Sequence, residues 1–217
     1  MSHAPMPGAE ALTEPLRSRW SPSIFDAEHR LPAADIVTLL HAAQWAPSHG
    51  NQQPWRFVVC ERGGTSHQAL VPHLSRGNSG WVPRASVVFL TATQVADAPD
   101  KAEDEKAVDL PINLYCAGQA AAHLTLQAQA MGLGAHQFKG FDKDPVADAL
   151  GMPSYWRIVA GIAVGVRGNP AEVSERDQER EHRVRKRRPL AEIAYGDAWD
   201  EAWDGAIGQD PFAKLDE

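Results

Sequence analysis

The stretch Ala46-Pro-Ser-His-Gly-Asn-Gln-Gln-Pro-Trp55 lies between a segment with helical periodicity and a segment typical of a strand. Its two prolines fix φ, and its glycine permits a positive φ. Four of its side chains can both donate and accept hydrogen bonds: Ser48, Asn51, Gln52 and Gln53. Uncharged polar groups beside an apolar tryptophan suit a flat heterocycle with one polar edge. The alternative interpretation is a connecting loop with turn residues and a core tryptophan.

The elements on either side of this loop follow from hydrophobic spacing. Apolar residues recur at i, i+3, i+4 and i+7 from Ile36 to Ala43, which predicts an amphipathic helix over 35–45 after Pro32. The next residues, 56–61, are short, β-branched and followed by two glycines, which predicts a strand.

The remainder of the chain alternates between helical and strand patterns. We predict helices over 66–74, 108–131 and 144–151, strands over 85–91 and 157–166, and a surface loop or lid over 94–106. In the helix over 144–151, Asp144 is the expected cap, Pro145 the first helical residue and Gly151 the end. The pattern predicts an α+β fold, a three-layer α-β-α sandwich around a mainly antiparallel sheet.

The predicted helix over 108–131 is the longest element. Six apolar residues recur in it at helical spacing: Leu114, Ala117, Ala121, Leu124, Ala128 and Met131. Small residues occur on several of its faces, so we expect it to be buried on more than one stripe. Such a helix is either the central rod of the domain or part of a subunit interface.

Composition excludes several functional classes. A net charge of −7 over 217 residues offers no general basic surface for a nucleic acid. Two cysteines do not make a disulfide framework or thiolate cluster, and the nine histidines show no metal-ligand spacing. Neither a transmembrane run nor an export signal is apparent, so we expect a soluble cytoplasmic protein without a membrane partner. Gly-x-Ser-x-Gly, phosphate-loop and Gly-x-Gly-x-x-Gly motifs are also absent from the sequence.

The two ends of the chain differ from its middle in composition. Residues 1–15 are small and proline-bearing without periodicity, which predicts a disordered arm. We expect a single domain over 16–195 and a tail over 196–217, in which Trp199 and Trp203 pack on a neighbour.

Two clusters of basic residues are candidates for binding an anion. In Arg17-Ser-Arg-Trp-Ser-Pro-Ser-Ile-Phe25, guanidinium groups and hydroxyls can converge on a phosphate, whereas the alternative is a solvated helix end. Near the C-terminus, Arg185-Lys-Arg-Arg188 follows an acidic run, and its alternative interpretation is a solvated helix.

Taken in order, these motifs resemble the FMN-dependent nitroreductase family over about Arg17 to Leu190. The loop matches Ala-Pro-Ser-x-x-Asn-x-Gln-Pro-Trp, residues 19–25 are similar to Arg-Arg-Ser-x-Arg-x-Phe, and residues 185–190 are similar to Arg-x-Arg-Lys-Pro-Leu. Ser23 departs from the family pattern, which has a basic residue there, and this weakens the local positive charge.

The resemblance implies a set of residues around tightly bound FMN. Arg19, Ser21, Arg185 and Arg187 would hold the phosphate and ribityl chain, Asn78 the pyrimidine edge, and the Gly140 backbone would approach N5, with Phe138 or Phe141 over a ring face. The full predicted cofactor-binding set is Arg19, Trp20, Ser21, Pro47, Ser48, His49, Asn51, Gln53, Asn78, Gly140, Arg185 and Arg187. No metal ligand is predicted.

The resemblance also implies a homodimer with FMN at the interface. Its expected activity is the transfer of two electrons from NADH or NADPH, a transient co-substrate, to a nitroaromatic, quinone or similar acceptor in a ping-pong cycle. The flavin carries the chemistry, and His49 is a candidate proton donor whose alternative is a structural or exposed histidine. The alternative hypotheses for the function are a flavin destructase, a reductive dehalogenase, or a flavin-binding protein without turnover.

Overall fold

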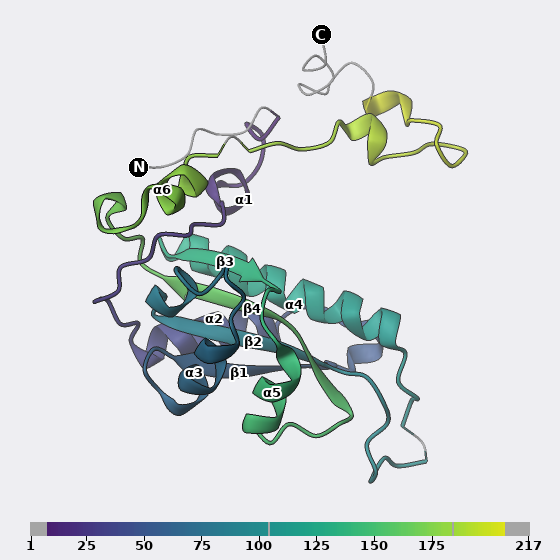
Figure 1. Ribbon diagram of the computed structural model, residues 1–217. Helices are drawn as coiled ribbons and strands as arrows, with labels where there is room; N and C mark the ends of the chain where they lie inside the picture. Colours follow the sequence, from purple (N-terminus) through teal and green to yellow (C-terminus); the bar gives the residue numbers. More distant parts are fainter. Residues whose placement is uncertain (1–7, 104, 184, 207–217) are drawn as a thin grey trace. The chain divides into compact units, whose positions relative to one another are not determined.

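The computed structural model describes residues 8–103, 105–183 and 185–206 (Figure 1). The chain divides into two compact units, Arg19–Glu181 and the two terminal segments Met1–Ser18 and His182–Glu217.

The larger unit is built on a four-stranded sheet. Its strands are β1 (Trp55–Glu61), β2 (Val87–Gln94), β3 (Gly134–Phe138) and β4 (Trp156–Gly165). They lie in the order β1-β2-β4-β3, and every neighbouring pair is antiparallel. Consequently β1 and β3 are the two edges of the sheet.

Alternating side chains of the strands enter two separate cores. In β2, Val87 and Phe89 pack with α2 (Ala33–Gln44) and α4 (Leu110–Ala130) on one face of the sheet. Val88 and Leu90 pack on the other face with residues of α3 (Thr65–Leu70) and α5 (Lys143–Ala149). Period-two alternation is what a sheet covered on both faces requires. The predicted three-layer α-β-α sandwich with an antiparallel sheet is therefore confirmed (Figure 1).

Element boundaries depart from the prediction at three places. A strand, β3, occupies residues that were predicted only as a segment passing over the ligand, and it adds a fourth strand to the three expected. Helix α5 begins at Lys143 after Asp142, so Asp144 is a first-turn residue and not the cap. The helix predicted over 66–74 ends at Leu70 and continues as a 3₁₀ turn.

Helix α4 buries one stripe in the single chain. The buried residues are Asn113, Cys116, Ala117, Ala120, Ala121, Leu124, Thr125 and Ala128. Leu114, which was predicted for the apolar pattern, is 42% exposed, and Tyr115 is 69% exposed. The chain on its own therefore leaves an apolar part of this helix open to solvent.

Shorter elements complete the larger unit. Helix α6 spans Glu175–Glu181, and the 3₁₀ turns are η1 (His49–Asn51), η2 (Val71–His73), η3 (Val82–Arg84) and η4 (Pro170–Glu172). Of the helices in the part of the chain that the structure describes, none is long and apolar enough to cross a membrane.

The smaller unit contains α1 (Glu14–Ser18) and the 3₁₀ turns η5 (Leu190–Glu192) and η6 (Asp204–Ala206). Tyr195 and Trp199 bring their rings to 5.0 Å, and the Trp199 side chain is 82% exposed. The predicted terminal arm and tail lie partly outside the described residues, at 1–7 and 207–217.

Candidate functional site

Asn78 and Gly140 are 62 residues apart in the sequence and are directly bonded in the fold. The Asn78 amide nitrogen Nδ2 donates to the Gly140 carbonyl at 3.0 Å, and Ser75 N–H donates to the same oxygen at 2.9 Å. The amide oxygen of Asn78 accepts from Trp81 Nε1 at 3.2 Å. The side chain is 9% exposed, so these bonds fix it in one orientation. Two predicted site residues, here called the Asn78–Gly140 pair, are thus brought together.

The absence of a side chain at residue 140 is required by this geometry. A Cβ there would lie 2.6 Å from Ser75 Oγ and 2.7 Å from Asn78 Nδ2, both closer than van der Waals contact allows. The glycine therefore permits the close approach of its backbone to Asn78.

Aromatic rings support this pair from the sheet side. Trp81 stacks on the His136 imidazole with ring centroids 4.2 Å apart. Phe138 and Phe141, predicted to cover a ligand face, are both buried in the core beside Trp81, at a 5.6 Å ring separation from each other. Their rings therefore belong to the buried aromatic cluster that contains Trp81.

Residues 19–23 form a second predicted part of the site, here called the 19–23 segment. Exposure alternates over its first four residues, because Trp20 and Pro22 are buried whereas Arg19 is half-buried and Ser21 exposed, and the alternation ends at the buried Ser23. In extended chain, alternate residues share a side. Arg19 and Ser21 are therefore the residues of this segment that solvent reaches, as a shared phosphate ligand requires.

The residue that departs from the family pattern, Ser23, is only 4% exposed. Its backbone N–H donates to a carboxylate oxygen of Glu181 at 2.7 Å, and the Trp20 indole Nε1 donates to the other oxygen at 2.9 Å. The Glu181 carboxylate therefore binds the backbone of residue 23, where the family pattern has a basic side chain.

His136 connects the 19–23 segment to the Asn78–Gly140 pair. Its Nδ1 lies 2.9 Å from the Pro22 carbonyl oxygen while its ring stacks on Trp81. Burial lowers the pKa of His136; the bond to Pro22 and the charge of Glu181 oppose this effect, and the charges of Arg180 and Arg19 add to it. The two predicted parts are therefore neighbours, in a region that contains Arg19, Arg180 and the Glu181 carboxylate.

The loop 46–55 is ordered by its own hydrogen bonds. Gln53 N–H donates to Ser48 Oγ at 3.0 Å, and Gln53 Nε2 donates to Asn51 O and Oδ1 at 3.2 Å each. Asn51 and Gln53 have positive φ, 57° and 50°, a conformation that costs free energy for residues other than glycine. The loop packs on α4 through His49 N–H, which donates to Cys116 Sγ at 3.4 Å. The side chains of Pro47, His49, Asn51 and Gln53 are exposed.

The structure does not bring this loop to the Asn78–Gly140 pair of the same chain. The loop leads into β1, whereas Gly140 follows β3, and β2 and β4 lie between these two edges. Three strand spacings correspond to about 14 Å. Within the larger unit, the loop and the Asn78–Gly140 pair therefore lie at opposite edges of the sheet, beside β1 and β3 (Figure 1).

Arg185 and Arg187 belong to the smaller unit. Arg187 Nη1 donates to the Lys186 carbonyl at 2.8 Å. Burial, and then the charge of Arg187, lower the pKa of Arg185. Their part in a phosphate site stays a prediction from the sequence.

Sequence reasoning missed three residues of this region. Glu181 was seen only as part of an acidic run, His136 only as one of several scattered histidines, and Arg167 was not singled out. Arg167 lies over the Trp20 ring, with 3.5 Å from its guanidinium carbon to the ring centroid. The sequence carries no local signal for these contacts because each joins residues far apart in the chain.

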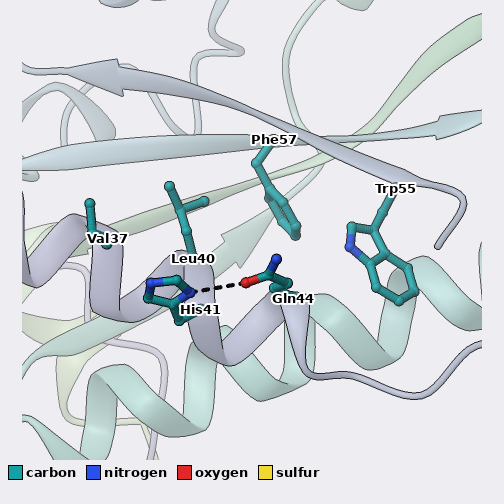
Figure 2. A pocket seen from close by; sticks show the side chains of 6 residues that line it. All are labelled: Val37, Leu40, His41, Gln44, Trp55 and Phe57. Carbon is teal, nitrogen blue, oxygen red and sulfur yellow. Dashed lines mark hydrogen bonds between the residues drawn. The ribbon is translucent and has the colours of Figure 1, made fainter.

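A separate apolar pocket of about 360 Å³ lies between α2 and the edge strand β1. Figure 2 shows Trp55 and Phe57 of β1 above Val37, Leu40, His41 and Gln44 of α2. None of these six lining residues is a lysine or arginine, so the pocket offers no cation to a phosphate. Within residues 8–103, 105–183 and 185–206, no three His, Cys, Asp or Glu side chains are grouped to hold a metal ion.

Comparisons with known proteins agree on one family. The family model described as "Nitroreductase family" matches residues 16–166. An uncharacterized 15.4 kDa protein of Mycolicibacterium smegmatis is 35% identical over 157 residues, 66% of this chain and 97% of that protein. A 5,6-dimethylbenzimidazole synthase of Rhodospirillum rubrum is 30% identical over 152 residues, 60% of this chain and 70% of that protein.

A solved structure extends the similarity over more of the chain. The crystal structure of an oxidoreductase containing FMN superposes with a TM-score of 0.80 at 32% identity, covering 92% of this chain and 98% of that one. The resemblance seen in the sequence is confirmed. The chain belongs to the nitroreductase family.

Proposed function

We propose that this protein is an FMN-dependent oxidoreductase that transfers two electrons from NAD(P)H to an electron-poor acceptor such as a nitroaromatic or a quinone. The observation that carries the proposal is the Asn78–Gly140 pair, which presents a fixed side-chain amide next to a backbone without a Cβ. A solved structure at 32% identity is an oxidoreductase containing FMN, which supports the same cofactor.

The residues of the larger unit fit this cofactor in kind. Arg19 and Ser21 are the residues of one segment that solvent reaches, and guanidinium and hydroxyl groups suit a phosphate. The neutral amide of Asn78 suits the alternating carbonyl and N–H groups of a pyrimidine edge. Arg185 and Arg187 are proposed to add positive charge at the phosphate, on the sequence motif alone.

When bound, FMN supplies the electron transfer, accepting two electrons from the nicotinamide and passing them to the acceptor in a ping-pong cycle. The protein's part is to bind and orient. Asn78 and Gly140 hold the polar edge, and the arginines near His136 favour negative charge on the ligand. No side chain acts as a nucleophile, and His49 is the proposed proton donor because it is exposed and an imidazole can carry a proton to or from a reacting group.

We further propose that the working unit is a homodimer in which the loop 46–55 of one chain reaches the Asn78–Gly140 pair of the other. Two observations support it: the two groups lie at opposite edges of the sheet within one chain, and α4 leaves Leu114 and Tyr115 exposed. An apolar helix face open to solvent is commonly covered in an assembly. The exposed Trp199 of the tail is proposed to pack on the same neighbour.

Anaerobic reduction tests the proposed activity. Purified protein loaded with FMN should lose its visible flavin absorption when NADH or NADPH is added, and a nitroaromatic or quinone should restore it. Protein that binds FMN but is reduced by neither nicotinamide would be a flavin-binding protein without turnover, contrary to the proposal.

A second candidate function is favoured by one relative, the 5,6-dimethylbenzimidazole synthase. Its product contains a dimethylated benzene ring, which flavins also contain, so the bound flavin would itself be consumed. Exposing the reduced protein to oxygen separates the two candidates. Recovery of the flavin absorption supports the oxidoreductase, and permanent bleaching with release of a benzimidazole supports the synthase.

A further inference from the structure

Glu181, at the end of α6, holds the 19–23 segment at two points. Its two carboxylate oxygens accept from the Trp20 indole at 2.9 Å and from Ser23 N–H at 2.7 Å. Hydrogen bonds to a carboxylate are shorter and stronger than bonds between neutral groups. One side chain of α6 therefore holds the Trp20 side chain before Ser21 and the Ser23 backbone after it.

The Trp20 side chain is fixed from a second direction. The Arg167 guanidinium lies 3.5 Å from the centroid of the indole, and its Nη2 donates to Gln129 Oε1 of α4 at 3.2 Å. Burial lowers the pKa of Arg167, and the negative charge of Glu181 opposes that effect. The Trp20 N–H is thus bonded to Glu181 of α6, and its ring face contacts Arg167, which is itself bonded to α4.

The same end of α6 also holds the loop that carries Asn78. Arg180 Nη1 donates to the Gly77 carbonyl at 2.8 Å. Two adjacent residues of α6 therefore bind two segments that are proposed to contact one cofactor.

We propose that Glu181 is the positioning residue for the cofactor phosphate: by holding Trp20 and Ser23, it keeps Arg19 and Ser21 turned outward together. This inference rests on the proposed function, because it presumes that FMN binds at the 19–23 segment. Its physical basis is preorganisation, since a segment already held in its binding conformation loses less conformational entropy when the ligand binds. Glu181 itself touches no part of the ligand.

The negative charge of Glu181 acts against FMN binding, whereas its positioning of the 19–23 segment favours binding. Whether a Glu181 variant binds FMN more weakly or more tightly therefore shows which effect is larger. A carboxylate near a phosphate repels it, so removing the charge alone would strengthen FMN binding. Trp20 N–H and Ser23 N–H bind this carboxylate, and the positive charge of Arg167 interacts with it, so its charge is offset. We therefore expect the loss of positioning to outweigh the loss of repulsion.

Comparing FMN with riboflavin isolates the phosphate. The two ligands share the ring and ribityl chain, and only FMN carries the phosphate, so fluorescence titrations of flavin-free protein with each report the phosphate contribution. Glu181→Ala should weaken FMN binding by about tenfold, with riboflavin changed by less than about twofold, and Glu181→Gln should fall between wild type and Glu181→Ala. Glu179→Gln, an exposed change on the same helix, is the matched control and should change neither affinity.

A second variant tests the route through Trp20. Trp20→Phe keeps a ring under Arg167 and removes the indole N–H, so it should also weaken FMN selectively, and combining it with Glu181→Ala should add little. Equal weakening of both flavins, unchanged FMN affinity, or tighter FMN binding in Glu181→Gln would each overturn the inference while leaving the proposed function in place. Wild-type protein that binds neither flavin would overturn both.

Discussion

The two edges of the sheet carry different parts of the predicted cofactor site and are organised differently. At the β3 edge, Asn78 is 9% exposed, and its amide is bonded to Gly140 and Trp81. At the β1 edge, the loop 46–55 exposes its polar side chains and is ordered by bonds among its own residues. A buried, cross-bonded group suits the fixed half of a binding site. An exposed, self-ordered loop suits a contact with another molecule.

This difference explains why the loop tolerates unfavourable backbone. Asn51 and Gln53 hold positive φ with exposed side chains, between two points where the loop backbone is bonded to the core, at His49 N–H and at the Pro54 carbonyl. Strain of this kind persists where surrounding contacts maintain it, and it is concentrated at functional sites. The proposed contact with the partner's cofactor would give the strained loop a purpose that the single chain does not.

The largest expected effect is at the β3 edge, from Gly140→Val. The new Cβ would meet Ser75 Oγ and Asn78 Nδ2 at 2.6 and 2.7 Å, so the Asn78–Gly140 pair must separate. We expect FMN binding to be lost and the free energy of unfolding to fall by about 1 to 3 kcal/mol. Flavin content after purification and urea denaturation measure the two effects. Gly77→Ala is the control from the same loop, because a Cβ there has no atom within 4 Å. Full flavin content in Gly140→Val would remove residue 140 from the site.

Mixing two defective chains tests whether the two edges act on one cofactor. Asn51→Ala and Asn78→Ala should each impair flavin binding as homodimers. If each site takes its loop from one chain and its Asn78–Gly140 pair from the other, the mixed dimer contains one intact site and one doubly defective site. Flavin stoichiometry of a heterodimer purified through two different tags should then reach about half of the wild-type value. If both groups came from one chain, the mixed dimer would contain no intact site and would stay as poor as its parents.

The sheet shows which strands local sequence patterns can predict and which they cannot. Strands β1, β2 and β4 were predicted within about three residues because they are rich in β-branched and aromatic residues bounded by turns. Strand β3, Gly-Ala-His-Gln-Phe, lacks β-branched residues, and its place is fixed by pairing with β4. Tertiary pairing, which no local pattern records, decides such a strand.

The candidate site divides in the same way. The loop 46–55, Asn78 and Gly140 were predicted as site residues from motifs whose residues are close together in sequence. Glu181 binds Trp20 across 161 residues and lies in a charged run that usually indicates a solvated surface. The motifs therefore predicted residues that contact the cofactor, but Glu181, which holds the 19–23 segment in place, could be found only from the fold.

A buried histidine, His67, and a half-buried one, His136, provide a smaller test of whether the edges unfold together. His67 lies on α3, which packs on β1, and His136 lies on β3. Burial lowers the pKa of both, so the folded state binds fewer protons than the unfolded state. Their contribution to stability is complete above the unfolded pKa of about 6.5 and is lost as the pH falls from there through the folded pKa values.

His67→Leu and His136→Asn remove these titrations separately. Leucine suits residue 67 because Nε2 of His67 is buried without a partner, and asparagine at residue 136 retains an N–H near the Pro22 carbonyl. Each variant should lose less stability than wild type between about pH 8 and about pH 5.5 in urea denaturation. Single transitions in all three proteins would indicate one cooperative unit. Separate transitions at low pH would show that the edges unfold independently.

The smallest expected effect is local to the loop 46–55, in Ser48→Ala. The change removes the acceptor of the Gln53 N–H, a neutral hydrogen bond of 3.0 Å, so we expect a cost of about 0.5 to 1.5 kcal/mol confined to the loop. Hydrogen exchange at the Gln53 amide should accelerate, while exchange in β2 stays unchanged because the core does not depend on this bond. Ser79→Ala is the counterpart beside Asn78; its hydroxyl makes only a 3.5 Å contact with the Arg76 carbonyl, so its removal should alter exchange little. If Ser48→Ala leaves Gln53 exchange unchanged, the loop is not ordered by its own bonds, and the contrast between the two edges rests on the Asn78–Gly140 pair alone.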